Sequence, residues 1–160
     1  MNLEPPTQPK LYIELVPSSS WFENLRSLLP DGGWDLVRKA AYKRAGYRCE
    51  ICGGKGEKWP VEAHEEFSYS DSGVQRLERV VALCPSCHQV KHFGLAQIQG
   101  KDQEALEHLM NVNTWTREQA QAHVHEAFSV WQHRSALTWT LNIERTLKWV
   151  EEKLEIPRAS

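Results

Sequence analysis

Four cysteines form two matched pairs near the middle of the chain. The pairs are Cys49-Glu-Ile-Cys52 and Cys84-Pro-Ser-Cys87, and the sequence has no other cysteine. A Cys-x-x-Cys turn lets two thiolates reach one ion, and two such turns complete the tetrahedral shell of a structural zinc. Gly53 and Gly54 allow the chain to turn tightly beside the first pair. The spacing therefore predicts one structural Zn²⁺ held by four thiolates.

Histidines lie near these cysteines and are not needed for that zinc. His64 falls in the 31-residue insert between the two pairs, in the stretch "WPVEAHEEFSYSDSG", two residues after Glu62. His88 follows Cys87 directly and His92 comes four residues later, so on a helix the two imidazoles share one face. Imidazoles at this spacing can bind one divalent ion. Since four thiolates saturate the zinc, the histidines predict a second metal site.

The stretch "CEICGG…VEAHEEF…LERVVALCPSCHQVKH" resembles the HNH nucleases, specifically those whose ββα-metal fold is stabilised by a four-cysteine zinc. The resemblance covers about residues 45–95. It implies a β-hairpin that carries His64 and a helix that carries the last histidines. The expected fold class is therefore α+β, with a zinc-stabilised, HNH-like core at about residues 47–94.

The resemblance also implies a function, namely metal-dependent hydrolysis of phosphodiester bonds in DNA. His64 matches the general base, a task that suits an imidazole because it titrates near neutral pH. His88, together with His92, would hold the catalytic cation, which could be Mg²⁺, Mn²⁺, Ni²⁺ or Zn²⁺. Lys91 would lie near the phosphate backbone of the nucleic acid.

Two positions depart from the family pattern. Ala63 stands where the family usually has a metal-binding Asp or His, so Glu62, on the same strand face as His64, is a candidate ligand in its place. Arg79 stands where the family has an Asn that orients the base. A guanidinium can contact phosphate but cannot accept a hydrogen bond from an imidazole N–H. Arg79 is thus a candidate catalytic residue with an altered role.

A second function is open from the same residues: a non-catalytic zinc module, on a degenerate HNH scaffold, that binds nucleic acid or a protein partner. This module needs one zinc, whereas the nuclease needs another cation beside its histidines. Charge does not decide between them, because residues 35–101 hold 11 basic and 8 acidic side chains, a weaker excess than phosphate binding usually shows. The remaining histidines are expected to be ordinary residues of amphipathic helices: His108, His123, His125 and His133.

Apolar spacing and capping signals predict the elements that position this core. Thr116 and Gln119 are placed for a capping box. Short strands are expected at 11–16 and 138–142, and their pairing would bring the two ends of the chain together. Helices are expected within residues 34–46, 101–112, 116–137 and 143–154.

The organisation expected from these elements is a loose tail at 1–10 and a single domain at 11–160. Its helical C-terminal extension, 102–155, could receive a protein partner. The 160 residues, 41% of them hydrophobic, suffice for one core. No apolar run approaches the roughly 18 residues of a membrane span, and the first residues lack the features of a secretory signal. A cytoplasmic protein with reduced cysteines and no membrane partner is the expectation.

Overall fold

The computed structural model describes residues 8–20 and 25–157, and these form a mixed α+β structure. A short 3-10 turn, Ser18–Ser20, precedes the first helix. The elements follow in the order α1 (Leu25–Leu28), α2 (Gly33–Arg44), β1 (Glu62–Tyr69), β2 (Val74–Leu83), α3 (Pro85–Lys91), α4 (Phe93–Ile98), α5 (Asp102–Asn113), α6 (Arg117–Ser135), β3 (Thr140–Asn142) and α7 (Glu144–Lys153).

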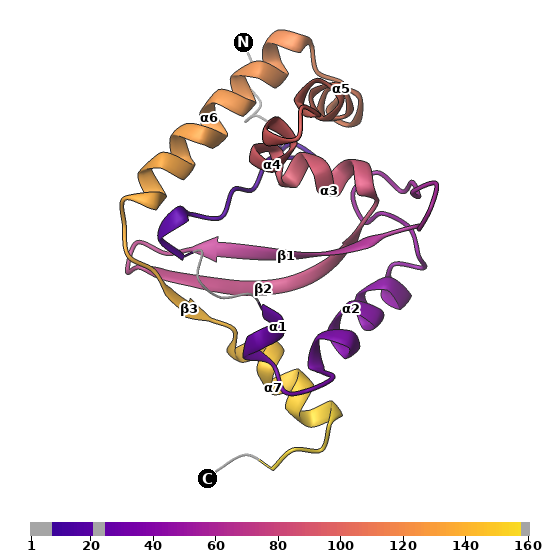
Figure 1. Ribbon diagram of the computed structural model, residues 1–160, viewed down its shortest axis with the longest axis vertical. Coiled ribbons are helices and arrows are strands. Elements are labelled where there is room, and N and C mark those ends of the chain that lie inside the picture. Colours follow the sequence, from indigo (N-terminus) through magenta and orange to yellow (C-terminus); the bar gives the residue numbers. More distant parts are fainter. Residues whose placement is uncertain (1–7, 21–24, 158–160) are drawn as a thin grey trace, which may run out of the picture.

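A three-stranded sheet with the order β1-β2-β3 crosses the middle of the molecule (Figure 1). β1 and β2 form an antiparallel hairpin in which His64 faces Val81. β3 pairs in parallel with the start of β2, at Val74 to Arg76. The insert between the cysteine pairs is therefore this hairpin, and α3 follows it immediately.

Helices cover both faces of the hairpin. Figure 1 shows α3, α4, α5 and α6 on one side and α1, α2 and α7 on the other. β2 contributes to both layers because side chains alternate along a strand and because a register shift opposite Glu66 and Phe67 interrupts the alternation between Leu77 and Arg79. Val81 and Leu83 belong to the first apolar core, and Leu77 and Val80 belong to the second. The run "VVAL" in β2 is apolar throughout because it is buried on two faces.

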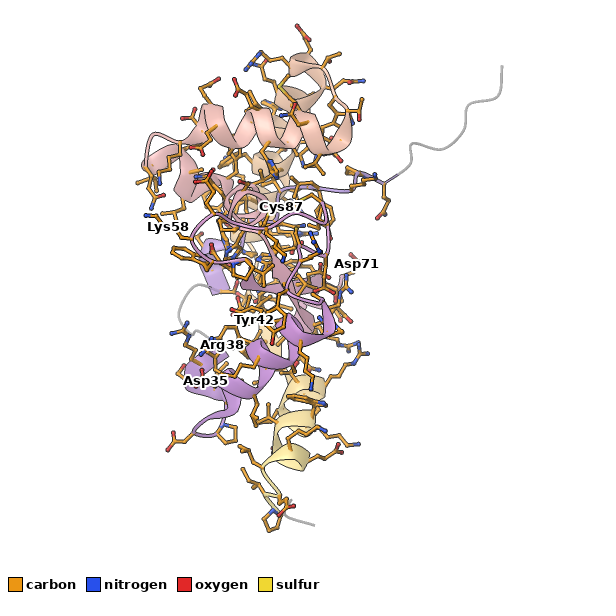
Figure 2. All side chains as sticks on the ribbon, turned by 90° about the vertical axis from the view of Figure 1, so that its right-hand side faces the viewer. Asp35, Arg38, Tyr42, Lys58, Asp71 and Cys87 are labelled. Atoms are coloured by element: carbon orange, nitrogen blue, oxygen red, sulfur yellow. The ribbon has the colours of Figure 1, made fainter. Side chains whose placement is uncertain are left out.

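Local sequence signals explain how the helices begin and pack. The capping box predicted for α6 is present: Thr116 Oγ1 accepts from the Gln119 N–H at 3.2 Å, and the Gln119 side chain accepts from the Thr116 N–H at 2.9 Å. α2 begins at Gly33, where a Cβ atom would lie 2.9 Å from the Val150 side chain of α7. Along the outer side of α2, Arg38 pairs with Asp35 (Figure 2).

The strand predicted at 11–16 is not formed, and its predicted pairing with residues 138–142 is wrong. The segment is extended, but side chains of α5 and α6 bond its backbone groups. Leu11 exchanges two hydrogen bonds with Asn113, the Ile13 N–H donates to His123 Nε2, and Trp131 Nε1 donates to the Val16 carbonyl. Alternating apolar residues predict an extended chain correctly, yet they do not reveal what pairs with it. Residues 11–17 are called the N-terminal strap below.

The structure tests the predictions of an N-terminal tail and of a C-terminal extension only in part. Residues 1–7 of the predicted tail lie outside the described residues. The predicted C-terminal extension contains α5, α6 and α7, with β3 before the last of them. Among the described residues, no helix combines the length and apolar character needed to cross a membrane.

Candidate metal centres

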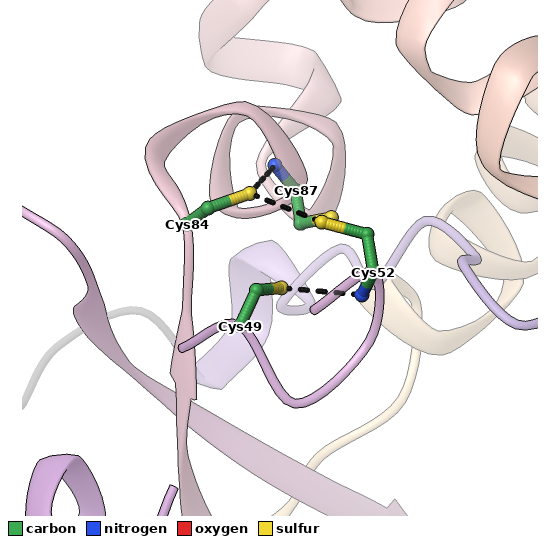
Figure 3. A group of neighbouring side chains, drawn as sticks. All are labelled: Cys49, Cys52, Cys84 and Cys87. Carbon is green, nitrogen blue, oxygen red and sulfur yellow. Dashed lines mark hydrogen bonds between the residues drawn. The ribbon is translucent and has the colours of Figure 1, made fainter. Parts of the chain in front are cut away.

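The four cysteines converge on one point, as their spacing predicts. Their sulfur atoms all lie within 4.8 Å of one another, and all four are free thiols. The Sγ atoms of Cys52 and Cys84 are 3.6 Å apart (Figure 3). Tetrahedral Zn–S bonds of about 2.3 Å place sulfurs roughly 3.8 Å apart. The cluster therefore has the size and chemistry needed to hold one structural zinc.

Backbone N–H groups hold the sulfur atoms in place. Cys49 Sγ accepts from the N–H groups of Ile51 and Cys52, at 3.4 and 3.5 Å. Cys84 caps α3 and accepts from the Cys87 N–H at 3.4 Å (Figure 3). These contacts come from residues within three positions of each cysteine. The shape of each half-site is thus a local property of the Cys-x-x-Cys turn.

Electrostatics within the cluster favour a bound cation. Hydrogen bonds from Cys84 and Cys87 lower the pKa of the Cys49 thiol far below its usual range. The Cys49 thiolate in turn raises the pKa of Cys84 to about 12 and also raises that of Cys87. Neighbouring thiolates therefore oppose one another's ionisation, and a positive ion would relieve that repulsion.

His108 is a member of this site that the sequence analysis missed. Its Nε2 atom, on α5, lies 3.1 Å from Cys87 Sγ. Burial lowers the pKa of His108, so the ring is neutral and its N–H can donate to the sulfur. His108 follows Cys87 by 21 residues, which is no recognised ligand spacing. No sequence signal distinguished it from other helix histidines.

Three imidazoles form a second cluster. One ring nitrogen each from His64 on β1, His88 on α3 and His92 at the end of α3 lie within 4.8 Å of one another. The rings meet edge to face, with centroids 4.8 to 5.3 Å apart. Three nitrogens at such separations can hold one divalent ion and leave a position open for another ligand. The structure thus brings together the three histidines that the sequence singled out.

His64 is the most unusual of the three, because it is buried without a hydrogen-bond partner. Its side chain is 3% exposed, and neither Nδ1 nor Nε2 makes a hydrogen bond. A buried imidazole normally satisfies at least one nitrogen. These nitrogens make no hydrogen bond, and one of them lies within 4.8 Å of nitrogens of His88 and His92.

Glu62 lies behind His88 and outside the group of three imidazoles. Its carboxylate is 3.2 Å from His88 Nδ1, which leaves Nε2 of that ring for a metal. Carboxylates commonly orient metal-binding histidines in this way. Burial lowers the pKa of His88 and, with the neighbouring His88 and His64 rings, lowers that of His92 to about 4. Both rings are therefore neutral at pH 7, the form that binds metal.

Lys91 does not face a nucleic acid, contrary to the prediction from sequence. Its side chain is fully buried, with Nζ 2.7 Å from Glu14 Oε1 and 3.4 Å from the centre of the Tyr12 ring. Helical spacing places Lys91 one turn from His88, but it does not say which side of α3 faces solvent. The N-terminal strap covers that side.

Arg79 pairs with an acidic residue across the hairpin. It faces Glu66 in the sheet register, and its Nε donates to Glu66 Oε2 at 2.7 Å. This side chain is 59% exposed. The structure therefore places the guanidinium in an exposed ion pair on β2 rather than in contact with His64.

A cavity of about 880 Å³ adjoins the imidazole cluster. The N-terminal strap, β1 and α6 enclose it, and both His64 and His92 contribute to its lining. Its walls also include charged and aromatic side chains, among them Glu65, Trp131 and Arg134. The cavity therefore adjoins two of the three imidazoles.

Comparison with known proteins identifies one partial relative. The chain is 29% identical over 62 residues to anaredoxin from Nostoc sp., and the match covers 39% of this chain and 79% of that protein. No protein-family model matches the chain, and no solved structure is significantly similar to it. What the two clusters can do therefore follows from their own side chains.

Proposed function

We propose that the protein is a metal-dependent nuclease of the HNH type, which hydrolyses phosphodiester bonds in DNA. In this proposal the hairpin β1-β2 and helix α3 are a ββα-metal core, with zinc in the cysteine cluster. His88 and His92 would hold a second divalent cation, and Glu62 would orient His88. A cation bound there would supply stabilisation of the negative charge on the reacting phosphate.

The residues of this chain would perform the hydrolysis as follows. His64 accepts a proton from a water molecule, whose oxygen forms a bond to phosphorus. The bond between phosphorus and the 3′ oxygen breaks, and the departing oxygen takes a proton from solvent. An imidazole whose nitrogen lies within 4.8 Å of nitrogens of His88 and His92 suits the first step.

The observation that carries the proposal is the position of His64. It comes from a different element than His88 and His92, yet its nitrogens are buried beside theirs and make no hydrogen bond. The Glu14 carboxylate approaches Nε2 only to 3.6 Å, so no hydrogen bond occupies either nitrogen.

The test is cleavage of supercoiled plasmid by the purified protein with Mg²⁺, Mn²⁺, Ni²⁺, Zn²⁺ or EDTA, beside His64→Ala. We expect metal-dependent nicking that falls by about 10²- to 10⁴-fold in the variant, which is the usual contribution of a general base. His125→Ala, an exposed histidine of α6, is the matched control. Absence of cleavage with every metal, in protein that retains its zinc, would refute the nuclease.

A non-catalytic metal module is the second candidate, and two contacts favour it. Lys91 is buried against Glu14, and Arg79 is paired with Glu66, so neither cation is free to hold a phosphate. In this case one tightly bound metal would suffice. Tetrahedral four-sulfur sites hold zinc or iron, and elemental analysis with the visible absorption spectrum distinguishes the two.

A further inference from the structure

The N-terminal strap carries a carboxylate into the imidazole cluster. Glu14 Oε2 lies 3.6 Å from His64 Nε2, while Glu14 Oε1 accepts from Lys91 Nζ at 2.7 Å. The two oxygens of one carboxylate thus face a histidine of the cluster and a buried lysine. Glu14 lies outside residues 45–95, the part of the chain that resembles the nuclease family.

The position of Glu14 is determined from both ends of the strap. The Glu14 N–H donates to the Lys91 carbonyl at 3.3 Å, which ties the strap to the end of α3. On one side Ile13 bonds His123, and on the other Val16 accepts from Trp131. The strap therefore holds the carboxylate in one place instead of leaving it on a loose tail.

Charge also holds the carboxylate in place. Burial raises the pKa of Glu14, but His64 and the Lys91 ammonium outweigh that effect and bring the pKa below its usual range. The fully buried Lys91 is explained in the same way, because a buried ammonium requires a carboxylate beside it.

We propose that Glu14 is the positioning residue of His64. The carboxylate selects the tautomer of His64 that carries its proton on Nε2, and it leaves the lone pair of Nδ1 for the attacking water. This inference rests on the proposed nuclease function and deepens it. Arg79, at the position where the family has its orienting Asn, bonds Glu66 and does not perform that task.

In known catalytic sites, a carboxylate behind the catalytic histidine holds the ring in one tautomer and one orientation. Glu14 would act on His64 in the same way. The separation of 3.6 Å is longer than a hydrogen bond, and such contacts shorten when a substrate or cation is present. Lys91 on α3 thus contacts Glu14 on the strap, and Glu14 in turn faces His64 on β1.

The test measures the tautomer of His64 directly, by nitrogen-15 NMR of the imidazole at pH 8. The sample is the full chain with one equivalent of zinc. The double variant Glu14→Leu/Lys91→Met removes both buried charges together, which preserves folding better than leaving one charge unpaired. His125→Ala, an exposed substitution on α6 that keeps both buried charges, is the control.

We expect the Nε2–H form of His64 in the wild type and in His125→Ala, and a mixture of tautomers in the double variant. In cleavage assays the double variant should lose at least about tenfold in kcat, while Glu14→Asp, which keeps a carboxylate, should recover part of that loss. An unchanged tautomer in a folded double variant would overturn the inference.

The two proposals can fail separately. If the tautomer changes and the wild type cleaves no DNA with any metal, Glu14 orients His64 but the nuclease proposal is wrong. If the wild type cleaves DNA and the double variant keeps both the tautomer and kcat, the nuclease stands and the role of Glu14 is refuted.

Discussion

The two candidate metal clusters are built in opposite ways. Each half of the cysteine cluster is a turn of four residues, in which nearby backbone N–H groups bond the sulfurs. The imidazole cluster draws on β1 and α3, and the N-terminal strap closes over it. The cysteine cluster forms when two local turns meet. The imidazole cluster forms only when three separate segments pack in the correct relative positions.

From this difference we expect the cysteine cluster to contribute mainly to stability and the imidazole cluster mainly to function. The cysteine cluster joins the loop between α2 and β1 to the start of α3, and Cys49, Cys84 and Cys87 belong to the first apolar core. The imidazole cluster keeps polar groups buried and unpaired, an arrangement that destabilises a fold and is retained at functional sites. Removal of the first should therefore unfold the protein, and removal of the second should alter binding.

The largest effect is expected from Cys87→Ser. Cys87 is fully buried, and loss of one thiolate should greatly weaken the zinc, whose binding is typically worth about 10–16 kcal/mol in small structural sites. We expect loss of bound zinc and of the cooperative thermal transition, measured by elemental analysis and circular dichroism. A stable, cooperatively folded and zinc-free Cys87→Ser protein would remove the contrast between the two clusters.

The second effect concerns His92→Ala. One imidazole fewer should weaken binding of Ni²⁺ or Mn²⁺ at the imidazole cluster by at least about 100-fold, while zinc content and the thermal midpoint stay near wild type. Titration calorimetry on zinc-loaded protein measures the binding.

Glu62→Gln should weaken binding of the same ions less than His92→Ala does. It should cost about 10- to 100-fold in affinity for the same ions, because the carboxylate orients His88 without joining the cluster. Equal metal binding by wild type and both variants would show that the imidazoles are not a metal site.

A smaller effect is expected from His108→Ala. The N–H from His108 to Cys87 Sγ should stabilise the thiolate, so its loss should raise the release rate of zinc by about tenfold without unfolding the chain. Competition with a coloured chelator measures the rate. His133→Ala, an exposed histidine near the end of α6, is the control, and equal rates in the two variants would count against a role for His108.

The smallest effect is a pH dependence of the strap. Burial lowers the pKa of His123 from its ordinary 6.5, Glu126 opposes this shift, and Lys91 adds to it. Below pH about 6.5 the unfolded chain takes up a proton that the folded chain resists, so the free energy of unfolding should fall on acidification, by less than about 1 kcal/mol for this residue.

His123→Gln keeps an acceptor for the Ile13 N–H and removes the titration. Urea unfolding at pH 7.5 and 5.5 should therefore show a smaller pH difference in the variant than in the wild type. An identical difference in both proteins would exclude His123 as the cause.

Much of this architecture is readable from the chain alone. Paired Cys-x-x-Cys turns predict the thiolate cluster because the geometry of each turn depends on four consecutive residues. The capping box at Thr116 and the apolar spacing of α2, α5, α6 and α7 are local in the same sense. The four-residue spacing of His88 and His92 predicts that they lie together, and they do.

What the chain alone does not determine is which distant groups meet. The alternation of apolar and polar residues in the strap predicts a strand. Its hydrogen-bond partners are instead the side chains of Asn113, His123 and Trp131, about a hundred positions away. Lys91 is buried, and His108 reaches Cys87, through the same long-range packing. Residue types and short spacings determine which ions can bind; only the packing of separate elements decides that Glu14, rather than Arg79, faces His64.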